Sequence, residues 1–176
     1  MLIYDALKKD HETVKALLER LVGSADADKE TRNALINQIR DELIPHSRAE
    51  EAVFYNSLRE IDEVKDLVAH GYQEHMMAEG LLRTLQVADK VDIGWQQTAR
   101  KLQDALLHHI EEEEGTIFSA ARQVLAIEEA EALGEAFEQM KPEVREEGFV
   151  QTTIDMITNM MPQRFVGGFK NLLSRS

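Results

Sequence analysis

Three short segments of this 176-residue chain each place a histidine four residues before a glutamate. In an α-helix, residues four apart lie about 40° from each other around the axis, so each pair presents an imidazole and a carboxylate on one face. Neutral imidazole and carboxylate together suit iron, manganese or zinc. If all the pairs point into one helical bundle, the sequence predicts a site for two metal ions. The pairs are His46 with Glu50, His75 with Glu79, and His109 with Glu113.

A fourth histidine, His11, lies near the start of the chain, within Asp10-His11-Glu12. A single His–Glu pair is more often an exposed salt link, and a single histidine on an apolar face is more often a hydrogen-bonded core residue. Three pairs in register with His11 favour metal binding instead, because burying three carboxylates without cations costs several kcal/mol each. We expect no lysine or arginine beside them on the inner helix faces. The candidate ligands are His11, His46, Glu50, His75, Glu79, His109 and Glu113.

Apolar residues recur at spacings of three and four around every candidate ligand, which is the pattern of a helix with one buried face. These stripes cover residues 7–21, 36–61, 64–82 and 95–124. Short connectors between long helices favour an all-α, up-and-down antiparallel four-helix bundle, in which facing side chains build cofactor sites. Pro45 lies inside the second stripe and predicts a kink there.

The chain after the bundle has a different character. We expect residues 1–125 to form the metal-binding bundle and residues 126–176 to form a C-terminal helical extension, whose first helix runs from Glu128 to Lys141. Beyond Pro142 a loose apolar stripe follows. The extension is expected to dock on the bundle or to form a homodimer. The less favoured alternative is contact with an anionic membrane surface through Arg164, Lys170 and Arg175.

Charge and composition narrow the function. The formal net charge of −13 repels phosphate backbones and argues against nucleic acid as a partner. The chain has no cysteine, which excludes disulfides, thiolate ligands and cysteine nucleophiles. The start lacks the features of a signal peptide, and no stretch has the length of a membrane span. We therefore expect a cytoplasmic protein that does not bind membranes.

Two further histidines, His70 and His108, are also followed by glutamate at the fourth place, but acidic runs inflate that count. His70 lies about 140° around the helix from His75 and is expected to be solvated, and His108 to have a surface or supporting role. Glu51 and Glu114 follow candidate ligands directly and are expected to face solvent. No internal repeat is evident.

The ordered motifs resemble the haemerythrin-like family, also called the HHE cation-binding domain. The resemblance covers residues 1 to about 125. The matching phrases are Asp10-His11-Glu12; His46-Ser47-Arg48-Ala49-Glu50-Glu51 followed by Phe54-Tyr55; Glu74-His75 with Glu79; and His108-His109-Ile110-Glu111-Glu112-Glu113-Glu114 with Phe118.

The resemblance implies a four-helix bundle around a non-haem di-iron centre with an oxo or hydroxo bridge, although zinc or manganese could occupy the same ligands. It implies that one iron is held by His11 and His46 and the other by His75 and His109. Glu50 and Glu113 would then bridge the two irons. A count of ligands on two six-coordinate irons leaves one position open, where O2, peroxide or NO could bind.

One position departs from the oxygen carriers of the family. They have a fifth histidine four residues after the histidine of the third helix, whereas this chain has Glu79. Carboxylate in place of imidazole adds negative charge and favours Fe(III), which lowers the reduction potential. We therefore expect a poor O2 carrier.

Two functions stay open at this point. The first is a protein that binds or senses O2, NO or peroxide, or that handles iron. The second is a di-iron redox enzyme that decomposes peroxide or reduces NO, with Tyr72 or Tyr4 as a neighbouring donor. For both tyrosines, a plain role in the core is the preferred expectation. Steady-state turnover of peroxide would separate the two functions.

Overall fold

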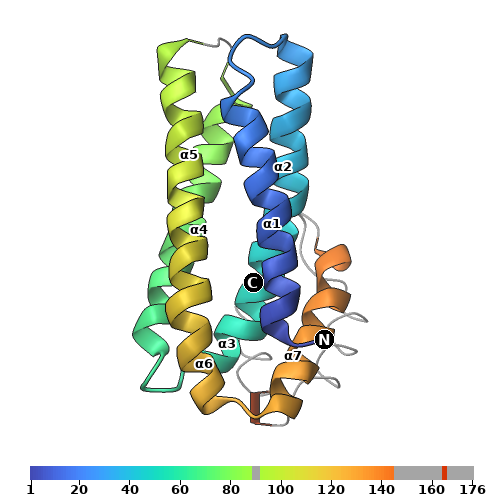
Figure 1. Cartoon of the computed structure of the whole chain (residues 1–176), viewed down its shortest axis with the longest axis vertical. Helices are drawn as coiled ribbons and strands as arrows, with labels where there is room; N and C mark the ends of the chain where they lie inside the picture. The colour runs from blue at the N-terminus through green and yellow to red at the C-terminus, as the bar shows by residue number, and fades with distance from the viewer. Residues whose placement is uncertain (89–91, 145–163, 166–176) are drawn as a thin grey trace.

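Four long helices form the body of the protein (Figure 1). The computed structural model describes residues 1–88, 92–144 and 164–165, and these contain helices and no strand. Helix α1 packs against α2 and α5, and α4 packs against α5 and α2, so the four helices close into a ring. Consecutive long helices run in opposite directions, which confirms the predicted up-and-down bundle. The helices are α1 (Ile3–Val22), α2 (Lys29–Glu50), α4 (Lys65–Gln86) and α5 (Ile93–Glu112).

Two of these helices begin at aspartate caps. The Asp28 carboxylate accepts a hydrogen bond from the Thr31 backbone N–H at 2.7 Å, and Asp92 does the same for Trp95 at 3.0 Å. Such caps satisfy backbone donors that have no partner inside the helix. Pro45 lies within α2 and does not end it, because the helix continues to Glu50.

Wider π-helical turns follow both α2 and α5. The first covers Glu51–Tyr55 and leads into α3 (Asn56–Leu58), and the second covers Glu113–Ile117 and leads into α6 (Phe118–Val124). Each lies at one of the predicted bridging glutamates. Single π-helical turns inside α-helices occur frequently at functional sites.

Helix α7 (Ile127–Met140) lies against the lower part of α1 and α2 and is followed by a 3-10 turn, Lys141–Glu143 (Figure 1). It matches the helix predicted from Glu128 to Lys141. A Cβ atom on Gly134 would lie 2.3 Å from the Met1 carbonyl oxygen, so glycine allows α7 to approach the start of α1 this closely.

The remainder of the extension is largely outside the described residues, including Phe149, Ile157, Lys170 and Arg175. Phe165 is described and is buried in the same apolar cluster as α7. The homodimer and the membrane contact therefore stay predictions. Among the helices of the described ranges, none combines the length and apolar character that crossing a bilayer requires.

Two apolar clusters divide the bundle along its length. The cluster that contains Val14, Leu43 and Leu106 is called the upper apolar cluster. The cluster that contains Leu7 and Phe118 is called the lower apolar cluster. Along α1, α2 and α4, and along α5 together with the turn that follows it, a histidine stands between the residues of one cluster and those of the other. The polar residues thus form one buried layer across the bundle. This layer includes His11, His46, Glu50, His75, His109 and Glu113.

Candidate metal centre

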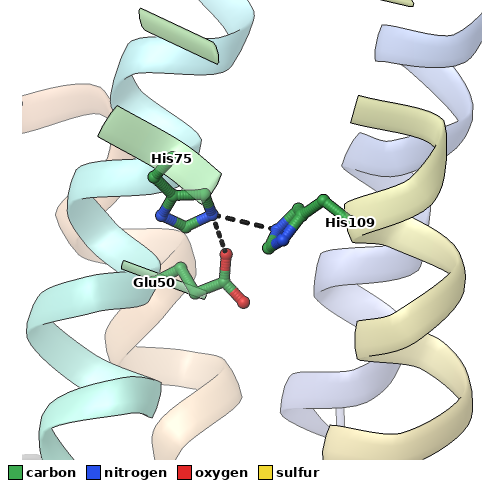
Figure 2. A group of neighbouring side chains, drawn as sticks. All are labelled: Glu50, His75 and His109. Carbon is green, nitrogen blue, oxygen red and sulfur yellow. Dashed lines mark hydrogen bonds and ion pairs between the residues drawn. The ribbon is translucent and has the colours of Figure 1, made fainter. Parts of the chain in front are cut away.

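Each long helix contributes one histidine to this layer. The four imidazoles are at most 3% exposed. The ring centroids of His11 and His46 are 5.1 Å apart and those of His75 and His109 are 4.6 Å apart, so the rings form two pairs. The Nε2 atoms of His75 and His109 approach to 3.0 Å, and Figure 2 shows both rings converging with Glu50. The pairs are those that the family resemblance assigns to two separate metals.

Glu50 and Glu113 are completely buried and each lies between the two histidine pairs. Glu50 Oε2 is 3.4 Å from the Nε2 atoms of both His46 and His75. Glu113 Oε2 is 3.2 Å from His11 Nε2 and 4.0 Å from His109 Nε2. Each carboxylate therefore faces one histidine from each pair, which is the arrangement a bridging ligand requires. We call these four histidines and two glutamates the inner ligands.

The polar atoms of the inner ligands fit a bound cation. Both carboxylate oxygens of Glu50, both of Glu113, and His11 Nε2 are buried and have no hydrogen-bond partner. Buried polar atoms in native proteins are almost always partnered, and unpaired buried carboxylates are costly. Metal ions would satisfy all of these atoms at once. The donor set of imidazole nitrogen and carboxylate oxygen suits iron, manganese or zinc.

The electrostatics of the protein alone lead to the same conclusion. Burial, together with the charge of Glu50, raises the pKa of Glu113 well above its usual range. Burial and the nearby His46 lower the pKa of His11 to about 4, which keeps this imidazole in its neutral, ligating form. Although burial lowers the pKa of His75, its contacts with Glu50 and Glu51 raise it to about 9. Metal binding at Glu113 and His75 would therefore release protons, whereas His11 is already neutral.

Four further acids, which we call the outer carboxylates, hold the histidines in place. Each accepts a hydrogen bond from the Nδ1 atom of a histidine on the neighbouring helix, which leaves Nε2 free to bind metal. Together they join α1 to α2, α2 to α4, α4 to α5 and α5 back to α1. The pairs are Asp10 with His46 (3.2 Å), Glu51 with His75 (3.0 Å), Glu74 with His109 (2.8 Å) and Glu114 with His11 (2.9 Å).

The expectation that Glu51 and Glu114 face solvent is wrong, because their side chains are only 16% and 23% exposed. Each reaches back across the bundle to the histidine of another helix. A signal for this was present, since every outer carboxylate is adjacent in sequence to an inner ligand. Nothing in the chain order, however, indicates which histidine each acid would reach.

Glu79 is placed differently from the other six predicted ligands. Its Oε2 atom lies 2.8 Å from Arg48 Nη2, and its side chain is 22% exposed. The Arg48 side chain is 43% exposed, so Glu79 pairs with a basic residue at the surface rather than on an inner helix face. The Oε1 atom of Glu79 is buried and has no hydrogen-bond partner, and its role as a metal ligand stays a prediction.

Tyr55, which belongs to a quoted motif but was given no role, contacts a histidine of the inner ligands, His75. Its buried ring stacks on His75 with 5.5 Å between centroids and 11° between planes, and its hydroxyl is buried without a hydrogen-bond partner. Tyr72 donates a hydrogen bond to the Glu51 carbonyl oxygen at 3.1 Å. Tyr4 packs against the aromatic rings below the site, as a core residue does.

A small cavity of about 10 Å³ is lined by the four histidines and does not have Glu50 or Glu113 among its lining residues. This volume corresponds to roughly one water-sized molecule. Apart from the histidines, its walls are aliphatic and belong mainly to the upper apolar cluster. The lining residues are His11, His46, His75 and His109 with Val14, Leu43, Leu106 and Ile110.

A four-helix bundle with this buried layer of facing histidines and glutamates defines a cation-binding protein. Residues 2–121 match the family described as the Hemerythrin HHE cation binding domain, and the chain belongs to that family. A DNA nickase of Nostoc sp. (strain PCC 7120 / SAG 25.82 / UTEX 2576) is 28% identical over 146 residues, which are 83% of this chain. The chain spans 41% of the length of that relative.

Proposed function

We propose that the centre holds two iron ions and that the protein binds or senses a small ligand, O2, NO or peroxide, in the cavity beside the histidines. The observation that carries this proposal is the cavity itself, which is lined by all four histidines and otherwise by aliphatic side chains. Mostly apolar walls with a few polar groups are typical of small-molecule sites. The size of the cavity restricts the ligand to very few atoms.

Different side chains would have different roles in holding such a centre. The histidine pairs would hold one iron each, Glu50 and Glu113 would join them, and the outer carboxylates fix the orientation of the rings. When bound, the irons would supply reversible ligand binding and electron exchange. The poor O2 carriage that we expect depends on Glu79 as a ligand, and the pairing of Glu79 with Arg48 makes this position the one to test.

Binding is favoured over turnover by the chemistry of the cavity wall. Breaking the O–O bond of peroxide is helped by a positioned proton donor. The four residues other than histidine that line the cavity are aliphatic, and Tyr55 is not among the lining residues. A di-iron redox enzyme that decomposes peroxide or reduces NO is therefore the second candidate.

The proposal is tested by narrowing the cavity without touching a ligand. Val14→Ile adds one methylene to the cavity wall, and Val53→Ile adds the same group to the lower apolar cluster, away from the cavity. Nitric oxide is titrated onto the reduced, iron-loaded proteins. We expect Val14→Ile to weaken NO binding at least tenfold at unchanged iron content, and Val53→Ile to bind NO as the wild type does. Equal binding in all three proteins, or none in the wild type, would contradict the proposal.

A peroxide assay decides between binding and catalysis. We expect stoichiometric ligand binding and no sustained turnover of hydrogen peroxide by the iron-loaded protein. Turnover that disappears in His109→Ala would support the redox enzyme instead. Turnover that persists in that variant would point to iron outside the centre.

We do not extend the activity of the Nostoc relative to this chain. Most of that protein lies outside the matched region, and the net charge of −13 disfavours approach to DNA. The prediction that nucleic acid is not a partner is tested by incubating the iron-loaded protein with supercoiled plasmid. If the wild type nicks the plasmid and the His109→Ala variant does not, the prediction that nucleic acid is not a partner is wrong.

A further inference from the structure

Four side chains of α4 and α5 gather outside the inner centre, and we call them the surface cluster: His70, Glu74, His108 and Glu112. The metal-binding atoms of His70, Glu74 and Glu112 all lie within 4.8 Å of one another. His70 Nε2 is 3.6 Å from Glu74 Oε1 and 3.8 Å from Glu112 Oε2. His108 Nε2 is 4.0 Å and 3.7 Å from the same two oxygens. The His–Glu pairs that the sequence left as surface features therefore converge on one point.

These separations match metal coordination better than hydrogen bonding. They exceed the 2.7–3.2 Å of a good N–H···O hydrogen bond, so the four groups face one another without bonding. Ligands about 2.0–2.2 Å from a tetrahedral zinc ion lie roughly 3.3–3.6 Å apart. The His70–Glu distances are within a few tenths of an ångström of that geometry, whereas His108, which is not in the 4.8 Å group, would have to move further, and its side chain is 68% exposed. Two imidazoles and two carboxylates also form a donor set that zinc and ferrous iron accept.

A comparison of the four outer carboxylates supports a cation at this place. Asp10 lies 2.7 Å from the Lys141 ammonium, Glu51 lies 3.3 Å from Arg48, and Glu114 lies within 4 Å of two lysines. Glu74 has no such ion pair with a lysine or arginine in the part of the chain that the structure describes. It faces two imidazoles and a second carboxylate instead. Where the other three outer carboxylates have a basic residue, Glu74 has the donors for a metal ion.

We propose that the surface cluster binds one divalent transition-metal cation and that this is where metal enters the inner centre. The inner ligands are at most 3% exposed, so a cation must be handed to them by groups nearer the surface. Glu74 connects the two places directly, because Oε1 faces the surface cluster while Oε2 accepts the hydrogen bond from His109 at 2.8 Å. The inference requires only that the inner centre binds cations and does not depend on which small ligand it takes.

The first experiment tests whether the surface cluster binds a cation. Cobalt(II) is titrated onto the iron-loaded protein, and the bound ions are counted by elemental analysis and by the visible Co²⁺ absorption. We expect one Co²⁺ per chain in addition to the iron. The double variant His70→Ala/His108→Ala should lose this ion, with at least a tenfold weaker affinity, and Glu111→Gln, an exposed acid outside the cluster, should retain it.

No additional Co²⁺ in the wild type, or the same Co²⁺ in the double variant, would overturn the surface site. Both histidine side chains are at least half exposed, so the double variant is expected to fold normally. His46→Ala provides an independent check, because it damages the inner centre and leaves the surface cluster intact. It should still bind Co²⁺ at the surface even if its iron content falls, so failure of the inner centre and failure of the surface site give different results.

The second experiment addresses metal entry. Exchange of bound iron for isotopically labelled ferrous iron is followed by mass spectrometry in the intact loaded protein. We expect the double variant to exchange at least several-fold more slowly than the wild type and Glu111→Gln, while the total iron at saturation is equal. Equal exchange rates in the three proteins would refute the role in entry.

Discussion

The α1–α2 half of the bundle and the α4–α5 half present the same functional groups, but α7 packs chiefly on the first half. In the first half Asp10 supports His46, and in the second Glu74 supports His109. Glu50 and Glu113 occupy matching places, each at a π-helical turn. The layer that binds metal is thus built twice, by two helix pairs that face each other.

The two halves differ outside that shared layer. Asp10 is neutralised by Lys141, from the turn after α7, whereas its counterpart Glu74 faces the exposed His70 and His108. In the first half the ammonium group of Lys141 neutralises the outer carboxylate. In the second half the outer carboxylate and its two exposed histidines are accessible to cations from solution. The inner ligands thus determine what the protein binds, while the residues around the outer carboxylates determine from which side a metal ion reaches the centre.

The largest effect is expected from the bridging glutamates, which the comparison treats as equivalent. Glu50→Gln and Glu113→Gln should each lower iron affinity by more than about 100-fold, because each removes a ligand shared by both metals and outer partners alone are worth 10–100-fold. The thermal midpoint of each iron-loaded variant should fall towards that of the metal-free protein. Competition with a chelator measures the affinity. Loss of iron in one variant and retention in the other would break the equivalence of the halves.

The next largest effect concerns the matched supports Asp10 and Glu74. Asp10→Asn and Glu74→Gln should each weaken iron binding about 10–100-fold, because the histidine that each supports loses its charged acceptor. Asp10→Asn should also destabilise the fold more than Glu74→Gln does, by about 1 kcal/mol, since it leaves the Lys141 ammonium without its partner. Chelator competition and urea unfolding report the two effects separately. Equal unfolding curves for both variants would contradict the proposed asymmetry.

The inner layer could be predicted because its signal is local. A histidine and a glutamate four residues apart, inside an apolar stripe, must share a helix face, so six inner ligands followed from periodicity together with the family resemblance. Glu79 satisfies the same rule, yet it pairs with Arg48 of another helix. Spacing within one helix determines the face of a residue but carries no information about its partner across the bundle.

The outer layer could not be predicted for the same reason. Which histidine Glu51 or Glu114 reaches depends on how neighbouring helices are staggered, and the π-helical turns alter that stagger without a mark in the apolar pattern. No internal repeat is evident in the sequence either. The structure shows that Asp10-His11 corresponds to Glu74-His75 and that the segments at Glu50 and Glu113 correspond, a relation visible only after their places are known.

The halves also differ in how a histidine is supported from below. Tyr55 stacks on His75, whereas Phe118, after the second π-helical turn, packs against Tyr4. A Cβ atom on Gly71 would lie 2.6 Å from the Tyr55 hydroxyl and 2.8 Å from its ring. Gly71→Ala should therefore cost about 1–3 kcal/mol of stability, because the buried ring has little room to move.

Gly80 provides the matched control for Gly71 within the same helix. A Cβ atom there would meet nothing within 4 Å, so Gly80→Ala should stabilise the protein by up to about 1 kcal/mol through helix propensity. Thermal unfolding of both variants tests the pair. Equal midpoints for Gly71→Ala and the wild type would show that the stacking of Tyr55 on His75 does not depend on this glycine.

The smallest effect is expected from the ion pair between Lys141 and Asp10 in the first half. Burial alone would raise the pKa of Asp10, but hydrogen bonds to His46 and Lys141 outweigh it and lower the pKa below its ordinary value of 3.8. A depressed carboxylate pKa stabilises the fold above the ordinary value, and that stability is lost as the pH falls through the folded-state pKa. Lys141→Met should therefore cost about 1 kcal/mol at pH 7, since the lysine is partly exposed.

The difference in stability between the wild type and Lys141→Met should shrink as the pH falls below 3.8, because protonated Asp10 no longer attracts the ammonium group. Urea unfolding of the wild type and Lys141→Met at several pH values measures it, with Lys101→Met, an exposed lysine on α5, as the control. The control should match the wild type at every pH. If Lys141→Met matched it too, the contact with Asp10 would contribute packing and no net charge stabilisation, and the electrostatic contrast between the two halves would rest on the surface cluster alone.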